Sequence, residues 1–484
     1  MAQDILTLKP TNVWKFFHEI CQIPHPSKKE QKMGAYLVAT GKKMGLETIQ
    51  DRAGNVLIRK PATKGKEKVT PVIFQSHMDM VCEKNADTVF NFEKDAIQPY
   101  IDGEWVKAKG TTLGADDGIG MAIALAILED KEIEHGPIEC LFTVDEETGL
   151  TGAFALEPGF LKGKMLLNLD SEDEGQFFIG CAGGVDTVAT LDYKAEKPNP
   201  DMLPYKVTVK GLKGGHSGDD INKNLGNANK ILNRVLYHGT YHHDIAIAHI
   251  DSGNLRNAIA REGYAVIMVP KYEAKAMEEY VKEFNKTVKN ELFTSDANVE
   301  VSMAPTDMPK TVIDDFTQSD LVDAIYACPH GVLAMSQNVE NFVETSTNLA
   351  SIKMDDKQIT ITTSQRSSVE SKKDDAKNMI AALFGLINAD IEHSDGYPGW
   401  APNTDSKVLH ALHASYKRLF NKEPLVLAIH AGLECGLIGE KYPDMDMISY
   451  GPTLRGVHSP DEKLLIASVQ QVWDLTVDFL KSIR

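Results

Sequence analysis

Two short motifs of the sequence combine residue types that bind metal ions. His77 and Asp79 stand one residue apart in HMDMV, directly after an apolar run. If the extended backbone continues, both side chains point to the same side, so that one can bind a metal while the other orients the histidine ring through its N–H. Asp116 and Asp117 lie in the glycine-flanked motif GADDGIG, before an apolar segment. Either aspartate could instead serve only as a helix cap.

Further carboxylates and a second histidine follow downstream. The motif DEETG, residues 145–149, sets three acids in a row after another apolar run. A solvated turn could carry such a run, but at the end of a buried strand adjacent carboxylates repel one another, and a cation relieves that cost. Asp170 ends the next apolar run, and His458 lies far along the chain in GPTLRGVHSPDE. A single histidine there could equally be structural.

Together these motifs supply two histidines and at least three carboxylates, which are enough ligands for two metal ions. Nitrogen and oxygen ligands without thiolate suit Zn²⁺, with Mn²⁺ or Co²⁺ as substitutes. A carboxylate that binds no metal could act as a general base. The six cysteines form no CxxC pair, so we expect neither a thiolate zinc site nor a disulfide framework.

Short buried strands would bring these side chains together. Three apolar runs stop at polar residues, as the central strands of an α/β sheet do. They cover residues 71–77, 137–144 and 164–170. Residues 118–130 are apolar nearly all round, which predicts a helix packed beside the sheet. In open α/β sheets the chemistry lies at the carboxyl ends of the strands, where the acidic and histidine motifs fall.

The pattern changes after residue 185. Residues 204–211 alternate apolar and polar side chains, which is typical of a sheet with one wet face. Helical and strand-like patterns then follow one another. The helical ones cover 221–236, 272–291 and 370–388, and the strand-like ones cover 263–269, 298–304, 349–354 and 358–364. This mixture predicts an α+β domain whose sheet has one face covered by helices.

The α/β texture returns near residues 397–403 and ends with an amphipathic helix at 463–483. At 484 residues the chain is too long for one ordinary core. We therefore expect a discontinuous α/β catalytic domain with an α+β domain inserted in it. The catalytic domain would comprise 1–185 and 397–484, and the inserted domain 186–396.

Composition and charge limit the partners and the cellular location that can be expected for this protein. The formal net charge of -18 argues against a nucleic-acid partner or an anionic membrane surface. No apolar run approaches the roughly 20 residues of a membrane span, and the N-terminal residues show no basic segment followed by an apolar one. These features predict a cytoplasmic protein without a signal peptide.

The same motifs resemble a known group of enzymes. HMDMV, GADDGIG, DEETG, Asp170 and His458 are similar to the five-ligand set of the di-zinc aminopeptidase, carboxypeptidase and aminoacylase clan. Within that clan, IPHPS, KGLKGGHSGDDI, IHAGLECG, GPTLRGVHSPDE and the long run at 97–122 resemble the bacterial aminoacyl-histidine dipeptidase family. These stretches extend from near the N-terminus to near the C-terminus, so the resemblance covers essentially the whole chain.

The resemblance implies a role for each motif residue and two Zn²⁺ ions per subunit. The implied metal ligands are His77 and Asp170 for one ion, Glu147 and His458 for the other, and Asp116 as the bridge. Asp79 would orient His77, and Glu146 would be the general base. The inserted domain would be a lid and dimerisation domain built on a four-stranded antiparallel sheet, and the protein a homodimer.

The implied reaction is metal-dependent hydrolysis of dipeptides, including Xaa-His and β-alanyl-histidine, by a water held by the two zinc ions. His216 in GGHSG resembles a lid histidine that supports the oxyanion, which in a dimer could come from the other subunit. Three more residues are candidate substrate contacts. Arg366 could hold the substrate carboxylate, Asn257 a carbonyl or carboxylate, and Glu434 the free amino group.

Each of these four residues also has an ordinary structural explanation. His216 could be a loop histidine beside flexible glycines, and Arg366 could form a surface ion pair. Asn257 could belong to a turn, and Glu434 could be a solvated helix acid.

Other functions remain open at this point. An aminoacylase, a carboxypeptidase or a tripeptidase would share the fold. A non-catalytic member would be expected to have lost ligands or the base, and here Glu146 and all five ligand positions are present.

Overall fold

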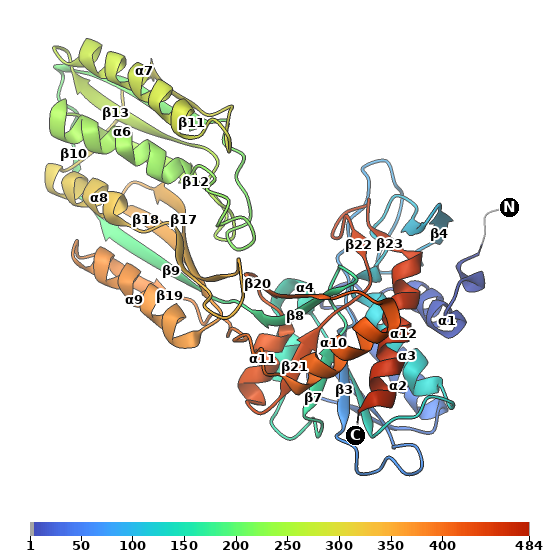
Figure 1. Cartoon of the computed structure of the whole chain (residues 1–484). Coiled ribbons are helices and arrows are strands. Elements are labelled where there is room, and N and C mark those ends of the chain that lie inside the picture. The colour runs from blue at the N-terminus through green and yellow to red at the C-terminus, as the bar shows by residue number, and fades with distance from the viewer. Residues whose placement is uncertain (1–3, 484) are drawn as a thin grey trace. The chain divides into compact units, whose positions relative to one another are not determined.

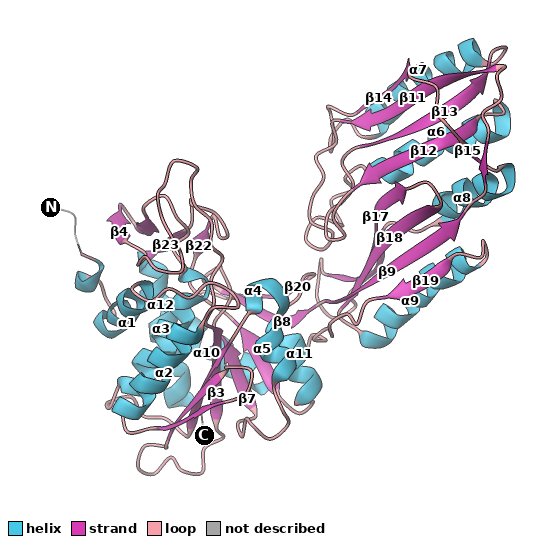
Figure 2. Ribbon diagram, turned by 180° about the vertical axis from the view of Figure 1, so that it is seen from behind, coloured by secondary structure: helices cyan, strands magenta, loops and turns pink. Residues whose placement is uncertain are grey.

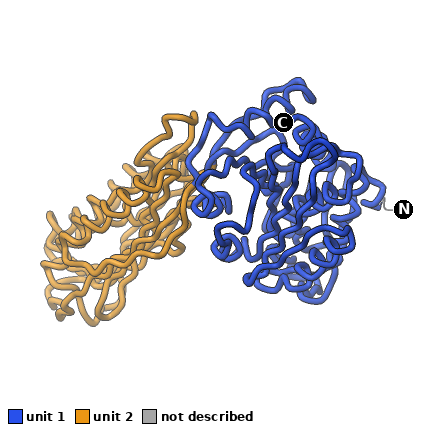
Figure 3. Tube along the Cα trace, turned by 90° about the horizontal axis from the view of Figure 1, so that it is seen from below, with its two compact units in different colours: residues 1–180, 400–428, 433–484 blue, residues 181–399, 429–432 orange. Residues whose placement is uncertain are grey.

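The computed structural model describes residues 4–483 and divides the chain into two compact units (Figures 1 and 3). Unit 1 comprises 1–180, 400–428 and 433–484, and unit 2 comprises 181–399 and 429–432. The expected boundaries after residues 185 and 396 differ from these by a few residues, and the sequence pattern does not indicate that 429–432 groups with the insert. Residues 1–3 and 484, which begin and end the expected catalytic domain, lie outside the described part.

Unit 1 is built on an eight-stranded sheet in the order β1-β2-β6-β3-β7-β21-β8-β20. Its strands are β1 (Glu47–Gln50), β2 (Val56–Lys60), β3 (Val72–His77), β6 (Ile138–Thr143), β7 (Met165–Asn168), β8 (Gln176–Cys181), β20 (Leu425–Ile429) and β21 (Asp446–Ser449). Strands β6, β3, β7 and β21 run parallel to one another, while β1 pairs antiparallel with β2, β2 with β6 and β8 with β21. The expected α/β class is confirmed.

The central strands are apolar runs because both of their faces are covered. Every residue of β3 and β6 is buried, so neither strand shows the alternation of a half-exposed sheet. Helix α3 (Ala115–Glu129) packs on β3 and on α1 (Thr11–Cys21), as Figure 2 shows, and is buried from Gly118 to Leu128. Its sequence is therefore apolar on all sides, as expected for the segment 118–130.

The remaining helices of unit 1 surround this sheet. They are η1 (Ile5–Thr7), α2 (Gln31–Lys43), α4 (Glu146–Gly149), α5 (Thr151–Ala155), α10 (Lys407–Phe420), α11 (Glu434–Lys441) and α12 (Ile466–Ser482). A small antiparallel sheet has the order β22-β23-β5-β4. Its strands are β4 (Pro99–Asp102), β5 (Trp105–Ala108), β22 (Leu454–Arg455) and β23 (Lys463–Leu465). The terminal helix expected from residue 463 thus starts later, because 463–465 pair with β5 and β22.

Unit 2 contains a nine-stranded antiparallel sheet in the order β14-β11-β13-β12-β17-β18-β9-β19, with β16 paired to β17. Its strands are β9 (Gly183–Asp192), β11 (Met202–Lys210), β12 (Ala246–Gly253), β13 (Gly263–Pro270), β14 (Glu300–Pro305), β16 (Gly331–Met335), β17 (Val343–Met354), β18 (Gln358–Ser367) and β19 (Asp390–His393). A two-stranded pair joins β10 (Ala195–Glu196) to β15 (Val312–Ile313).

Helices cover one face of this sheet, as Figures 1 and 2 show from opposite sides. They are α6 (Ala228–His242), α7 (Ala274–Glu291), α8 (Asp315–Ala327) and α9 (Glu370–Gly385). Between helices and sheet lies an apolar core that includes Val207, Val235, Ile267, Val281 and Phe384. This agrees with the expected α+β architecture.

Two expectations for the insert are corrected. The four-stranded sheet implied by the resemblance is wrong: β17 and β18 extend into Ser- and Thr-rich sequence, and β9 and β12 join them. Hydroxyl and amide side chains bond across these buried strands, as between Thr345 and Ser367, so a polar sequence can be buried there. The helix expected from residue 221 begins at Ala228, because the Asn227 side chain caps it. Within 4–483 no helix is long and apolar enough to span a bilayer.

Candidate metal centre

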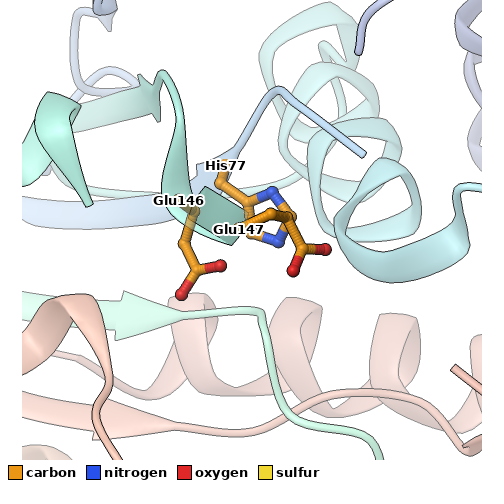
Figure 4. A group of neighbouring side chains, drawn as sticks. All are labelled: His77, Glu146 and Glu147. Atoms are coloured by element: carbon orange, nitrogen blue, oxygen red, sulfur yellow. The ribbon is translucent and has the colours of Figure 1, made fainter. Parts of the chain in front are cut away.

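The ends of three parallel strands place the predicted ligands at one edge of the main sheet. His77 is the last residue of β3, and Asp170 follows β7 by two residues. Glu146 and Glu147 begin α4, which starts three residues after the end of β6. Because β6, β3 and β7 are parallel neighbours, their carboxyl ends meet. Figure 4 shows His77, Glu146 and Glu147 gathered there, with ligand atoms within 4.8 Å of one another.

Asp116 lies between the two predicted histidines. Its Oδ1 atom is 3.0 Å from His77 Nε2, and its Oδ2 atom is 3.2 Å from His458 Nε2. His77 Nε2 is also 3.3 Å from Asp170 Oδ1, and His458 Nε2 is 3.0 Å from Glu147 Oε2. The predicted residues thus form two groups, each with ligand atoms within 4.8 Å of one another, that share Asp116.

Asp117 is separate from this arrangement. Its carboxylate is buried, and Oδ1 accepts the backbone N–H of Gly120 at 3.1 Å. The capping alternative therefore describes Asp117, while the neighbouring Asp116 faces the histidines.

Asp79 links His77 to the α4 carboxylates. Its Oδ1 atom is 3.4 Å from His77 Nδ1 and accepts the backbone N–H of Glu146 at 2.9 Å. Its Oδ2 atom accepts the N–H of Glu147 at 3.2 Å and the Ser27 hydroxyl at 2.8 Å. Burial is the largest single effect and opposes the charge of this carboxyl, but the hydrogen bond and charge of His77, with the N–H of Glu146 and the Ser27 hydroxyl, together outweigh burial and hold the Asp79 pKa at about 2. Asp79 is therefore an ionised acceptor at the back of the site.

The charges of the site favour a bound cation. Burial raises the pKa of Asp170 to about 8 and that of Glu146 well above its usual range. Burial disfavours a charged His77, yet the carboxylates of Asp170 and Asp116 raise its pKa well above its ordinary value. Hydrogen bonds to Asp116 and Glu147 raise the pKa of His458 to about 11. A metal ion that binds in place of these protons removes the free-energy cost of burying several carboxylates together.

A second observation supports the fit of a metal. Glu147 Oε1 is buried and has no hydrogen-bond partner among the described residues, which is costly for a carboxylate unless a cation faces it. The donor set contains imidazole nitrogen and carboxylate oxygen and no thiolate, which suits a zinc-type ion. The residues present therefore fit a divalent metal.

Another buried acidic group, formed by Glu30, Asp79 and Asp145, has its own hydrogen bonds. Asp145 Oδ2 accepts the hydroxyl of Thr151 at 2.8 Å, and Glu30 Oε1 accepts the N–H of Lys28 at 2.6 Å. These hydrogen bonds make the group a support behind the site.

Glu434 is a buried acid of unit 1. It begins α11 and is 0% exposed, so the solvated-acid alternative is wrong. Oε2 accepts Gln75 Nε2 at 2.6 Å and the Thr143 hydroxyl at 2.8 Å, whereas Oε1 has no hydrogen-bond partner among the described residues. Burial raises its pKa to about 7. The carboxyl thus has one oxygen free to accept a hydrogen bond from a substrate.

The other three predicted substrate contacts belong to unit 2. The Arg366 side chain is buried in β18, which rules out the surface ion pair considered for it. Its guanidinium donates to the Tyr397 hydroxyl at 2.8 Å and to Ser217 Oγ at 3.3 Å, and both partners are uncharged. His216 lies beside Ser217, and its Nδ1 atom accepts the N–H of Asp219 at 3.2 Å. Asn257 lies in an exposed turn, and its carbonyl accepts the N–H of Ser217 at 2.8 Å.

Sequence reasoning misses several residues around Arg366. His430 is buried in unit 2, and its Nε2 atom lies 2.7 Å from Ser346 Oγ. Burial and the charge of Arg366 lower the pKa of His430 to about 3, so the ring is neutral. His430 stands four residues before Glu434 in IHAGLECG, and that spacing is the only signal that points to it. Tyr397 and Ser217 carry no such signal.

Comparison with known proteins agrees with this geometry. The model of peptidase family M20/M25/M40 matches residues 73–482. The cytosol non-specific dipeptidase of Escherichia coli K12 is 44% identical over 480 residues, which cover 99% of each chain. The crystal structure of aminoacylhistidine dipeptidase from Vibrio alginolyticus has a TM-score of 0.94 at 44% identity and covers 100% of this chain and 98% of that chain.

A more distant structure shares the fold alone. Aminopeptidase PepT from Bacillus cereus has a TM-score of 0.58 at 17% identity and covers 98% of this chain and 99% of that chain. The family match spans most of the sequence, and the two close relatives align along nearly its whole length. The chain belongs to peptidase family M20/M25/M40.

Proposed function

We propose that this chain hydrolyses dipeptides, including Xaa-His and β-alanyl-histidine, with two Zn²⁺ ions per subunit. The observation that carries the proposal is the position of Asp116, whose two oxygens lie 3.0 Å from His77 and 3.2 Å from His458. One carboxylate facing two histidines in this way suits a bridge between two ions. The names of the two relatives at 44% identity support dipeptides as the substrate.

The proposed ligands divide between the two ions. His77 and Asp170 hold one ion, Glu147 and His458 hold the other, and Asp116 bridges them. Mn²⁺ or Co²⁺ are expected to substitute, because imidazole and carboxylate accept all three metals. Asp79 fixes the His77 ring by facing its Nδ1 atom.

The proposed base is Glu146. Bound divalent ions would polarise the scissile carbonyl and lower the pKa of the attacking water. Glu146 then takes the proton of that water and passes it to the leaving amine. Its backbone N–H is held by Asp79 at 2.9 Å, which fixes the start of α4. Burial raises the Glu146 pKa, which suits a group that must both accept and return a proton.

The proposed substrate contacts hold the two ends of a dipeptide. The free oxygen of Glu434 accepts the amino group, and the Arg366 guanidinium, which donates hydrogen bonds to two hydroxyl groups of unit 2, pairs with the carboxylate. His216 supports the oxyanion, and Asn257 contacts a substrate carbonyl or carboxylate.

The experiment compares β-alanyl-histidine, Leu-His, a tripeptide and an N-acetylated amino acid as substrates. Activity on the dipeptides should vanish on chelation and return with Zn²⁺. Preference for the tripeptide or the N-acetylated substrate would move the assignment to a tripeptidase or an aminoacylase. Cleavage of none by folded, metal-loaded protein would favour a non-catalytic role.

The proposal includes a cytoplasmic homodimer that associates through unit 2, the proposed lid. Strand β16 supports this, since within residues 4–483 it pairs with β17 alone and exposes Val332, Leu333 and Met335. Light scattering coupled to size-exclusion chromatography should give twice the chain mass. Replacing Leu333 with Lys should weaken the dimer, and a monomeric wild-type protein would contradict the proposal.

A further inference from the structure

The loop that leads to Asp116 is held by a buried carboxylate from a distant part of the chain. Glu462 is 2% exposed, and both of its oxygens accept backbone N–H groups. Oε2 accepts those of Leu113 at 2.6 Å and Gly114 at 3.0 Å. Oε1 accepts those of Ala115 at 2.8 Å and Asp116 at 3.4 Å. Four consecutive amides therefore converge on one side chain, which forms an anion-holding concavity of backbone N–H groups.

The same carboxylate belongs to the loop that presents His458. Strands β22 and β23 form a hairpin through Leu454 and Leu464, and residues 456–462 are its loop. Within the loop, the N–H of Glu462 donates to the Ser459 carbonyl at 3.0 Å. Strand β23 also pairs with β5, so the base of the hairpin is anchored in a sheet. His458 and Glu462 are therefore two points of one supported turn.

Glu462 thus joins the two segments that the metal centre brings together. At one side of the hairpin loop, His458 faces Asp116 Oδ2 at 3.2 Å. At the other, Glu462 holds the backbone of residues 113–116. Among residues 4–483, Glu462 is the side chain that accepts the N–H groups of these four residues. This contact ties the loop that carries the bridging carboxylate directly to the loop that carries the imidazole.

We propose that Glu462 is a positioning residue that fixes Asp116 relative to His458 and so sets the affinity of the metal ion these two residues share. The inference rests on the proposed ligand roles of Asp116 and His458. It adds a residue that touches neither metal nor substrate and acts through the backbone. Partners that orient metal ligands in this way change metal affinity by about 10- to 100-fold when they are replaced.

The test is Glu462→Gln, which keeps the size of the side chain but turns an NH₂ group toward backbone N–H donors. Glu139→Gln is the matched control. Glu139 is also buried and accepts two consecutive N–H groups, from Lys162 at 2.7 Å and Gly163 at 2.8 Å, yet it belongs to neither metal group. Glu462 accepts four backbone N–H groups, whereas Glu139 accepts two together with the Arg59 side chain at 2.7 Å, so each substitution disturbs a buried carboxylate with several donors. Thermal unfolding of each variant measures its general cost to the fold.

The readout is the Zn²⁺ dissociation constant of each of the two ions, measured by chelator competition. We expect Glu462→Gln to raise the dissociation constant of one ion by about 10- to 100-fold. Glu139→Gln should leave both dissociation constants within about twofold of wild type. Glu462→Asp, which retains the carboxylate on a shorter side chain, should recover part of the loss. It also provides the measurement if the glutamine variant does not fold.

Two outcomes separate the failure of this inference from the failure of the proposed function. If Glu462→Gln and Glu462→Asp bind both ions like wild type, Glu462 has only a general structural role and the inference is overturned. If wild-type protein binds two ions but cleaves no dipeptide, the proposed function fails while the affinities still decide the role of Glu462.

Discussion

Asp79 accepts the backbone N–H of Glu146 at 2.9 Å with the same oxygen that lies 3.4 Å from His77 Nδ1. One buried carboxylate therefore supports both a proposed metal ligand and the proposed base. The contact joins the motifs HMDMV and DEETG, which are far apart in the sequence. Altering Asp79 should disturb metal binding and proton transfer at the same time.

Asp79→Asn should lower kcat/KM by about 10- to 100-fold and weaken zinc binding, because the amide cannot accept on both sides and stabilises the imidazole less. Activity assays and zinc titration measure the two effects. Ser27→Ala is the control, since it removes only one of the groups that donate to Asp79. Equal effects of the two substitutions would argue against an orienting role for Asp79.

Glu146→Gln should reduce kcat by about 10²- to 10⁴-fold while two zinc ions remain bound, because the amide cannot take a proton from water. Zinc content by elemental analysis and kcat from initial rates test this together. The exposed Glu157, changed to Gln, is the control for an acid-to-amide change in unit 1. Unchanged hydrolysis in the Glu146 variant would rule out the proposed base.

Much of the metal centre could be predicted from the sequence because its geometry is local to strand ends. A buried strand ends at His77, and another ends just before Asp170, so each strand end determines where its side chain leaves the sheet. Parallel pairing of β3 with β7 brings the two ends together. His458 is different. Its place depends on the pairing of Lys463 with Lys107, which no local pattern encodes. Only the resemblance of its motif to a known family pointed to it.

The surroundings of Arg366 escaped prediction for a related reason. Its partners Ser217 and Tyr397 lie far from it in the sequence. The buried strands around it are rich in Ser and Thr, a composition that is typical of an exposed surface. Cross-strand hydrogen bonds such as Gln365 to Thr347 compensate this burial. Pattern alone does not distinguish a polar strand that is buried and paired from one that is solvated.

The metal-free protein should lose stability as pH rises from about 4 to about 8. An unfolded aspartate titrates near 3.9, and burial raises the pKa of Asp170 to about 8 in the folded chain. The folded state then binds the proton more tightly, so this contribution is fully present below pH 4 and is lost as pH approaches 8. The raised pKa of His77 adds a contribution to stability that changes in the same direction: it is present below about pH 6.5 and is lost as pH rises above that value.

Thermal unfolding of chelator-treated protein at pH 5, 6.5 and 8 tests this, and Tm should fall along the series. Zinc-loaded protein should show a smaller fall, because the metal replaces these protons. Asp170→Asn lacks the titrating group, so its metal-free form should show a flatter dependence. A Tm that rises toward pH 8 in metal-free wild type would contradict the assignment.

Arg366→Ala should raise KM and lower kcat/KM for Leu-His by about 10- to 100-fold, because a charge-assisted hydrogen bond to the substrate carboxylate is lost. The corresponding dipeptide amide has no carboxylate for the guanidinium to hold. Wild type and variant should therefore differ much less on the amide than on the free acid, although both cleave the amide slowly. Comparing the two ratios separates binding of the carboxylate from support of the fold, since loss of folding would lower both rates equally. An equal loss on both substrates would mean that Arg366 organises Ser217 and Tyr397 instead of binding the peptide.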